Sequence, residues 1–292
     1  MNKEDDFTQS RIAIVGLGLM GGSLALALQG RCKQVLGIDR DKATIALALE
    51  RGAVDIAHTD PGVILPQADI IILALPVRVI LETIQHLPQY HPGPAVVMDL
   101  GSTKVEILAA MSELPATFDP VGGHPMCGKE TSGFKNADPK MYLDAPFALT
   151  PLERTSARAR KVAEILVMAV GALPIWLDPE IHDTWVASTS HLPYLLAVAL
   201  ACTTPPEAAP LVGPGFRDVS RLAGSNREMM VDILTTNNEQ VLKVVGRFRG
   251  WFGEIEDAIQ AGDRAALMDL LERASHQRDF LIDNRGSDET QD

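Results

Sequence analysis

His124 is the side chain best suited to acid–base chemistry, because it lies in the Gly- and Pro-rich stretch 119–133, which is expected to be a loop beyond the sheet. Stretches of this composition often carry function. An imidazole titrates near neutral pH and is a common proton acceptor when a hydroxyl carbon loses hydride. A loop histidine can equally make a structural hydrogen bond. The sequence therefore offers His124 as a candidate general base, with a structural role as the alternative.

Two further side chains could contact a substrate. Ser102 follows the apolar run 95–99, and its hydroxyl could position a substrate hydroxyl or the cofactor, or cap the next helix. His191 opens an uncharged apolar segment, where a histidine is more often a satisfied core group than a ligand contact. Both interpretations stay open for each residue.

A glycine-rich turn near residue 215 carries a candidate anion site. Arg217 and Arg221 lie one helical turn apart, and Asp218 is spaced to pair with Arg221. An arginine at this place could hold a substrate carboxylate through two parallel hydrogen bonds. The alternative is a solvated surface pair, which contributes little to stability.

The elements that must position these groups begin with the stretch 11–40, which has the pattern strand, glycine turn, helix, strand. Gly16–Gly21 fits G-x-G-x-x-G, whose glycines permit a tight turn, close approach to a pyrophosphate and close helix packing. Asp39 lies about 20 residues further on, where a carboxylate can bind a ribose 2′-OH. The predicted dinucleotide contacts are Gly16, Gly18, Leu19, Met20, Gly21, Asp39, Arg40 and Pro76.

The choice of dinucleotide depends on two adjacent residues. The Asp39 carboxylate would accept hydrogen bonds from a free 2′-OH and repel a 2′-phosphate, which favours NAD. Arg40 could instead pair with a phosphate, so NADP is not excluded.

Strand and helix patterns alternate along the first part of the chain. This alternation predicts an α/β fold, a Rossmann-like doubly wound and mostly parallel sheet. Ligands bind such sheets at the carboxyl ends of the strands, so the turns that follow the strands should face one cleft. The strands are expected within 12–15, 35–38, 53–56, 68–76, 95–99, 147–150 and 174–177, and the cleft turns are 16–21, 76–78 and 101–104.

Beyond residue 178 the apolar spacing is helical throughout, with one long helix expected over about 226–260. A long apolar stripe on a small helical domain usually needs a partner chain to cover it. We therefore expect a dinucleotide-binding domain at 1–178 and an all-α substrate-binding and dimerisation domain at 179–292, forming a homodimer. The apolar part of the uncharged segment 184–206 is too short for a membrane span, and the segment predicts a helix buried at a domain or subunit contact.

Composition excludes several classes of function. The net charge of −12 with no basic stripe disfavours nucleic-acid binding. Cys32, Cys127 and Cys202 are far apart, which disfavours a metal site or a disulfide framework and suits a reducing cytosol. Residues 1–10 lack the apolar region of a signal peptide. A cytoplasmic protein acting on a small molecule is expected, with no membrane partner.

Together these motifs occur in an order that is similar to a known family. They are G-x-G-x-x-G-G-S-L-A from residue 16, Asp-Leu-Gly-Ser-x-Lys from 99, His-Pro-Met-x-Gly-x-Glu-x-Ser-Gly from 124, Ser-His-Leu-Pro from 190 and Gly-Phe-Arg-Asp-x-x-Arg from 215. From about Arg11 to about Asp283, the chain resembles the prephenate/arogenate dehydrogenases of tyrosine biosynthesis. The resemblance implies NAD(P)-linked oxidative decarboxylation of prephenate to 4-hydroxyphenylpyruvate, or of arogenate to tyrosine.

The resemblance also implies roles for single residues. His124 would accept the proton of the ring C4 hydroxyl as hydride leaves, and Ser102 would contact that hydroxyl. Glu130 would lie near the mouth of the site and His191 on the substrate side. Arg221 would bind a substrate carboxylate, with Asp218 in its ionic network.

Alternatives remain within and beyond this family. Tyr194 stands where some members carry a second histidine, close to the substrate's side chain, which leaves prephenate and arogenate both open. A β-hydroxyacid dehydrogenase is a more distant possibility, but the lysine expected for that class does not stand out in 181–201. A dinucleotide-sensing protein without catalysis would not need the candidate base.

Overall fold

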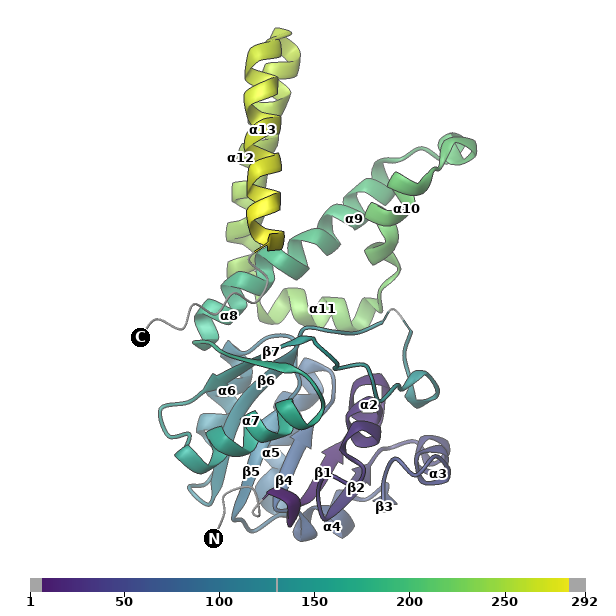
Figure 1. Ribbon diagram of the computed structural model, residues 1–292, viewed down its shortest axis with the longest axis vertical. Helices are drawn as coiled ribbons and strands as arrows, with labels where there is room; N and C mark the ends of the chain where they lie inside the picture. The colour runs from purple at the N-terminus through teal and green to yellow at the C-terminus, as the bar shows by residue number, and fades with distance from the viewer. Residues whose placement is uncertain (1–6, 130, 284–292) are drawn as a thin grey trace. The chain divides into compact units, whose positions relative to one another are not determined.

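The computed structural model describes residues 7–129 and 131–283. Met1–Val241 form one compact unit and Leu242–Asp292 a second (Figure 1). All of the candidate site residues belong to the first unit. The boundary predicted after residue 178 separates domains by function, whereas the division after Val241 separates them by compactness. The functional boundary stays a prediction.

The first unit is built on an eight-stranded sheet of order β3-β2-β1-β4-β5-β6-β7-β8. Strands β1 to β6 are parallel, whereas β7 runs antiparallel to β6 and β8 is parallel to β7. The predicted doubly wound, mostly parallel sheet is therefore confirmed. The strands are β1 (Arg11–Val15), β2 (Gln34–Ile38), β3 (Ile56–His58), β4 (Ile70–Leu73), β5 (Ala95–Asp99), β6 (Phe118–Pro125), β7 (Pro146–Pro151) and β8 (Leu173–Trp176).

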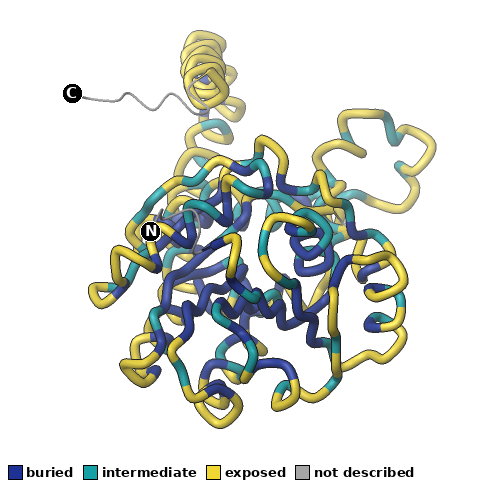
Figure 2. Tube along the Cα trace, turned by 60° about the horizontal axis from the view of Figure 1, so that its bottom comes forward, coloured by how far each residue is buried: buried dark blue, intermediate teal, exposed yellow. Residues whose placement is uncertain are grey.

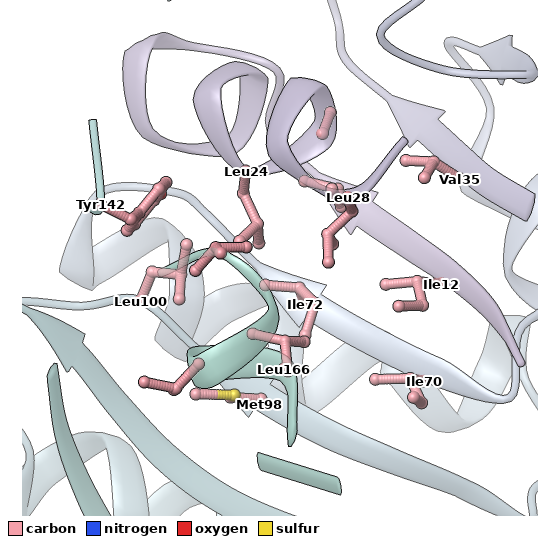
Figure 3. Close-up of a cluster of buried hydrophobic side chains, with 14 of the residues drawn as sticks. Ile12, Leu24, Leu28, Val35, Ile70, Ile72, Met98, Leu100, Tyr142 and Leu166 are labelled. Atoms are coloured by element: carbon pink, nitrogen blue, oxygen red, sulfur yellow. The ribbon is translucent and has the colours of Figure 1, made fainter. Parts of the chain in front are cut away.

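Helices cover both faces of this sheet, which is why its central strands are apolar without alternation. In β4, Ile70 and Ile72 face one buried cluster, and Ile71 and Leu73 face the other. Figure 3 shows part of the first cluster, and Figure 2 shows buried residues gathered in the interior of the chain with exposed residues around them. The covering helices are α2 (Leu19–Leu28), α3 (Lys42–Glu50), α4 (Pro61–Ile64), α5 (Val77–Tyr90), α6 (Val105–Ser112) and α7 (Ala157–Ala169).

The parallel strands bring their carboxyl ends to one edge of the sheet, as predicted. The glycine turn follows β1, and the turn that contains Ser102 follows β5. The expectation of a loop over 119–133 is wrong for its first part, since Phe118–Pro125 is β6. His124 is a strand residue, paired with Ala148 of the antiparallel β7. The Gly and Pro content of this stretch is typical of a loop, but the residues form a strand that is hydrogen-bonded to β5 on one side and β7 on the other.

From residue 179 to 283 the described chain is helical, as expected. The elements are α8 (Pro179–Val186), the π-helical turn η3 (Ala187–His191), α9 (Leu192–Thr203), η4 (Pro206–Leu211), α10 (Pro214–Ser220), η5 (Arg221–Gly224), α11 (Arg227–Thr236), α12 (Asn238–Ala261) and α13 (Arg264–Asp283) (Figure 1). The single long helix over 226–260 is a wrong prediction. The helix is interrupted at Asn237, whose buried side chain donates to the Asp183 carbonyl over 2.7 Å.

The continuous helical segment Pro179–Thr203 is long and apolar enough to cross a membrane by length and composition alone. Only 22% of the most apolar part of this segment is buried within the chain, so the expected burial is not provided by the chain itself. The segment carries the buried, hydrogen-bonded side chains of His182 and Asp183. Buried polar groups with internal partners suit a helix that packs in protein.

Candidate active site

The glycine turn after β1 has the geometry that a dinucleotide needs. Gly16 has φ of +93°, and a Cβ there would lie 2.5 Å from the Ala74 carbonyl oxygen. A Cβ on Gly21 would lie 1.9 Å from the Gly16 carbonyl oxygen, so α2 can pack this closely only with glycine. Gly18 has no atom within 4 Å of its Cβ position. The open face of Gly18 therefore leaves room for a pyrophosphate against the backbone.

The start of α2 and the end of β2 complete this site. Gly18 is the N-cap of α2 and offers no capping side chain, so the first amides, at Leu19 and Met20, are left for a phosphate. Asp39 is held by two backbone amides: Oδ2 accepts from Leu17 over 2.8 Å and Oδ1 from Asp41 over 2.9 Å. Each oxygen keeps a lone pair for a ribose hydroxyl.

Two other predicted cofactor contacts border the same edge of the sheet. Arg40 is exposed beside Asp39, and Pro76 is exposed at the N-cap of α5. Together with the glycine turn and the fixed Asp39 carboxylate, these positions fit a dinucleotide.

Replacing two of these glycines by alanine should separate folding from dinucleotide binding. Gly21→Ala should destabilise the protein by about 1–3 kcal/mol, because its Cβ collides with the Gly16 backbone. Gly18→Ala should leave stability within about 0.5 kcal/mol but weaken dinucleotide affinity about 10-fold, since the methyl group occupies the open face. Urea unfolding and calorimetric titration would measure the two effects. Unchanged affinity in Gly18→Ala would contradict the assignment.

His124 lies near the carboxyl end of β6 and is half-buried. Its Nδ1 lies 2.8 Å from Nε2 of His182, and the two rings meet edge to face with centroids 5.0 Å apart. His182 is buried on α8. One nitrogen of His124 is thus occupied by a protein partner, and Nε2 is the other position for a ligand.

Behind His182 lies a buried carboxylate that also caps a helix. The Nδ1 of His182 is 2.8 Å from Oδ1 of Asp183. The same carboxylate accepts from the backbone amides of Lys104 over 2.8 Å and Val105 over 2.9 Å. These amides lie at the N-terminus of α6, where a negative charge is favourable. Asp183 therefore connects the helical segment to the turn after β5.

A buried ion pair lies under the strand that carries His124. The Lys104 Nζ donates to the Asp99 carboxylate and, over 2.7 Å, to the Gly123 carbonyl. Asp99 accepts from the Gly123 amide over 3.2 Å and from the Gly101 amide over 2.7 Å. Both polar groups of Gly123, the residue before His124, are therefore held by this pair.

The environment keeps the histidines of the site neutral. Burial, followed by the charges of His182, Lys104 and His191, holds the pKa of His124 well below its usual range. Burial also lowers the pKa of His182, although the neighbouring Asp183 acts in the opposite direction. Burial lowers the pKa of His191 to about 4, against the opposing charge of Asp183. At neutral pH His124 can accept a proton.

The structure joins two more predicted residues to this group. His191 is buried, and its Nδ1 lies 3.3 Å from Nδ2 of Asn237. Ser102 precedes Thr103 and Lys104 in the turn held by Asp183, and it does not cap α6, which begins at Val105. Among the described residues, the Ser102 hydroxyl has no hydrogen-bond partner, so it is available to a ligand.

Three of the remaining predicted substrate contacts lie on helical elements that follow His191 in the chain. Tyr194 lies on α9, Asp218 on α10 and Arg221 at the start of η5, with Asp218 and Arg221 both exposed. Glu130 lies outside the described residues. The role of each of these residues stays a prediction.

Sequence reasoning missed the residues that hold His124, its strand and the neighbouring histidines. They are Asp99, Lys104, His182, Asp183 and Asn237. Lys104 belongs to a motif noted above but was given no role. A weak signal existed for the adjacent His182 and Asp183, a titratable pair directly before the uncharged segment 184–206.

Two family models match almost the whole of the described chain. The nucleotide-binding domain of prephenate dehydrogenase matches residues 24–175, and the dimerization domain of the same enzyme matches residues 178–273. The chain belongs to the prephenate dehydrogenase family. The resemblance inferred from the motifs is thereby confirmed, and the chain is an oxidoreductase with that family's nucleotide-binding domain.

Individual members of the prephenate dehydrogenase family agree with this result. The prephenate dehydrogenase of Bacillus subtilis is 32% identical over 92% of this chain and 76% of its own length. The crystal structure of Synechocystis arogenate dehydrogenase has a TM-score of 0.81 and 32% identity, covering 93% of this chain and 99% of that one. Prephenate dehydrogenase from A. aeolicus, in complex with hydroxyphenyl propionate and NAD+, has a TM-score of 0.86 and 29% identity, covering 94% and 98%.

Proposed function

We propose that this protein catalyses the NAD-dependent oxidative decarboxylation of prephenate to 4-hydroxyphenylpyruvate, a step of tyrosine biosynthesis. The observation that carries the proposal is the arrangement of His124. Its ring is held by His182 at the same edge of the sheet as the glycine turn, and one nitrogen is left for a ligand. The family assignment and the prephenate dehydrogenases among its relatives support the same reaction.

The side chains of the site divide the chemistry between them. The glycine turn, the start of α2 and Asp39 would hold NAD, which supplies the hydride acceptor when bound. His124 accepts the hydroxyl proton while hydride leaves the same ring carbon, and Ser102 donates or accepts a hydrogen bond at that oxygen. The ring carboxylate leaves as CO2, its bonding electrons complete the aromatic ring, and the proton returns to the oxygen of the phenol.

One assay tests this function. The full-length protein is given prephenate or arogenate with NAD or NADP, and reduced cofactor is followed by absorbance. We expect reduction with prephenate and NAD at the highest kcat/KM, with NADP disfavoured by the fixed Asp39 carboxylate. Absence of reduction in all four combinations would refute the proposal.

Arogenate is the second candidate substrate. The likeness to Synechocystis arogenate dehydrogenase is as close in sequence as the likeness to the Bacillus subtilis enzyme. Tyr194, in place of a histidine found in some family members, lies on α9 at the expected side-chain end of the substrate. A higher kcat/KM with arogenate than with prephenate in the same assay would make the protein an arogenate dehydrogenase.

Arg221→Ala should raise KM for the substrate about 10-fold or more with a smaller change in kcat. The reason is that a carboxylate contact made equally in the ground state and the transition state contributes to binding alone. Arg217→Ala, one helical turn away and also exposed, is the matched control and should leave KM within twofold. Steady-state kinetics with saturating NAD would measure both. Equal effects of the two variants would contradict the role of Arg221.

We further propose that two copies associate through the helical part of the chain, a cytoplasmic homodimer. In the unit Leu242–Asp292, α12 and α13 expose many large apolar side chains. Isolated two-helix units with such exposure usually require a partner. The family's dimerization domain spans 178–273 and supports a second copy as that partner. The exposed apolar side chains are Leu242, Trp251, Phe252, Ile259, Met268, Leu271, Phe280, Leu281 and Ile282.

Sedimentation equilibrium should therefore give twice the chain mass of 31.5 kDa. Leu271→Asp should shift the distribution toward the monomer, because Leu271 is 62% exposed in the single chain and a charge there would be buried by the partner. Asp269→Asn, on the same helix, is the control: it changes the charge of the helix but places no new charge in the interface. A monomer at micromolar concentration would contradict the dimer.

A further inference from the structure

The hydrogen-bond chain that starts at α6 determines which nitrogen of His124 is free to act as a base. Backbone amides can only donate, so the Asp183 oxygens that face Lys104 and Val105 must both accept. An ionised carboxylate at a helix N-terminus satisfies this requirement. Asp183 Oδ1 is therefore an acceptor toward His182 as well, and the hydrogen between them belongs to Nδ1 of His182.

The second link follows from the first. A neutral histidine with hydrogen on Nδ1 has a lone pair on Nε2. The Nε2 of His182 lies 2.8 Å from Nδ1 of His124, and the contact needs one donor. His124 must supply it, so its hydrogen lies on Nδ1 and its Nε2 carries the lone pair. The opposite tautomer of His124 would place two lone pairs against each other and would present a donor to the substrate.

We propose that Asp183 and His182 are positioning residues that hold His124 as the Nδ1–H tautomer, so that Nε2 is the atom that takes the substrate proton. The hydroxyl proton moves to Nε2 and returns to the same oxygen after CO2 leaves, and the Nδ1–H bond to His182 is kept throughout. The proton-accepting part of this inference rests on the proposed function. The tautomer itself rests only on the contacts of the protein.

The charges around the two rings agree with this assignment. The groups that face them are Asp183 and His191 from the helical segment, Lys104 at the start of α6 and Asp99 at the end of β5. Burial lowers the pKa of both rings, so both are neutral near pH 7 and each has one hydrogen to place. The cation that forms on His124 during the reaction is then stabilised by His182 and, behind it, by Asp183.

A third histidine provides a contrast within the same site. Asn237 Nδ2 donates to the Asp183 carbonyl over 2.7 Å, which fixes the orientation of its amide. The same Nδ2 lies 3.3 Å from Nδ1 of His191, so that nitrogen accepts. His191 should therefore carry its hydrogen on Nε2, the reverse of His124 and His182.

Nuclear magnetic resonance can determine the tautomer of each histidine directly in the full-length protein. The 7 histidines are labelled with 15N, and long-range 15N–1H correlation spectra distinguish Nδ1–H from Nε2–H rings. Single substitutions assign the signals of His124, His182 and His191. We expect Nδ1–H for the first two and Nε2–H for the third. A hydrogen on Nε2 of His124 would overturn the inference, whatever the activity of the enzyme.

Kinetics distinguish a hydrogen-bonding role from a packing role for His182. His182→Phe keeps an aromatic ring but removes the acceptor, and kcat should fall about 10- to 100-fold with little change in KM. His182→Gln offers an oxygen to Nδ1–H of His124 and should recover part of kcat. His86→Gln, an exposed histidine on α5, is the control and should be unchanged.

The outcomes separate this inference from the proposed function. A Phe variant that is as active as wild type, or more active than the Gln variant, would show that His182 only fills space. Inactive wild-type protein with both substrates would refute the function, and the spectra would still decide the tautomers. If His182→Phe does not fold, the wild-type spectrum alone decides the inference.

Discussion

His124→Asn is expected to lower kcat by about 10²-fold or more while the protein remains folded and binds NAD. The scale is that of losing a general base, since asparagine cannot accept a proton at neutral pH. The half-buried ring contributes little to the core, and its neighbour Gly123 keeps both of its backbone contacts. Steady-state kinetics and thermal unfolding would be measured on the same preparation.

The pH profile of the wild-type enzyme provides a companion measurement. Because the pKa of His124 lies well below its usual range, the base is neutral and competent across neutral pH. The logarithm of kcat/KM should be flat near pH 7 and should fall only as pH drops below the ordinary histidine range, where His124 becomes protonated. His124→Asn should lack this acid limb. A variant with wild-type kcat would exclude His124 as the base.

Lys104→Met is expected to destabilise the folded protein by about 3–5 kcal/mol, the cost of leaving one partner of a buried ion pair uncompensated. Both Lys104 and Asp99 are fully buried. Without the ammonium group, the Asp99 carboxylate keeps two backbone donors, and the Gly123 carbonyl loses its side-chain donor. Urea unfolding followed by circular dichroism would measure the change.

Two further variants show whether the effect belongs to the buried charge. Lys104→Met combined with Asp99→Asn should recover much of the stability, because the uncompensated charge is removed. Lys129→Met breaks the exposed pair between Lys129 and Asp138, which spans 3.2 Å, and should cost no more than about 1 kcal/mol. If Lys104→Met cost as little as Lys129→Met, the ion pair would have no structural role.

The sheet could be predicted from the sequence because its strands are apolar on both faces. The run 95–99 is β5 with the predicted bounds, and 68–76 contains β4. Such runs, separated by helical patterns, leave few alternatives to a parallel sheet. The glycine motif was predictable for a different reason, since Gly16 and Gly21 leave no room for a Cβ, and Gly18 leaves its face open for a dinucleotide.

The strand that carries His124 could not be predicted in the same way. Gly122, Gly123 and two prolines give β6 the composition of a loop. The strand exists because β5 and β7 pair with it on its two sides, and Gly123 gives the close approach that its neighbours require: a Cβ there would lie 2.4 Å from the Met98 side chain. These are properties of the assembled sheet, not of the local sequence.

The partners of His124 were missed because they are distant along the chain. His182 lies 58 residues from His124 along the chain. Asp183 lies 79 residues from Lys104, whose backbone amide donates a hydrogen bond to it. Local rules suggested Ser102 as the helix cap, since serine is a common N-cap. In the structure a carboxylate from another helix takes that place. Local propensity cannot reveal a cap that arrives from a remote segment.

The capping of α6 by Asp183 also has a consequence for the order in which the protein is assembled. The amides of Lys104 and Val105 cannot be protected by α6 itself, because a helix has no internal acceptors for its first N–H groups. Their hydrogen exchange with solvent therefore reports whether α8 is docked on the sheet. We expect the same carboxylate to couple the docking of α8 to the placement of His124, because Asp183 also holds His182, the partner of His124.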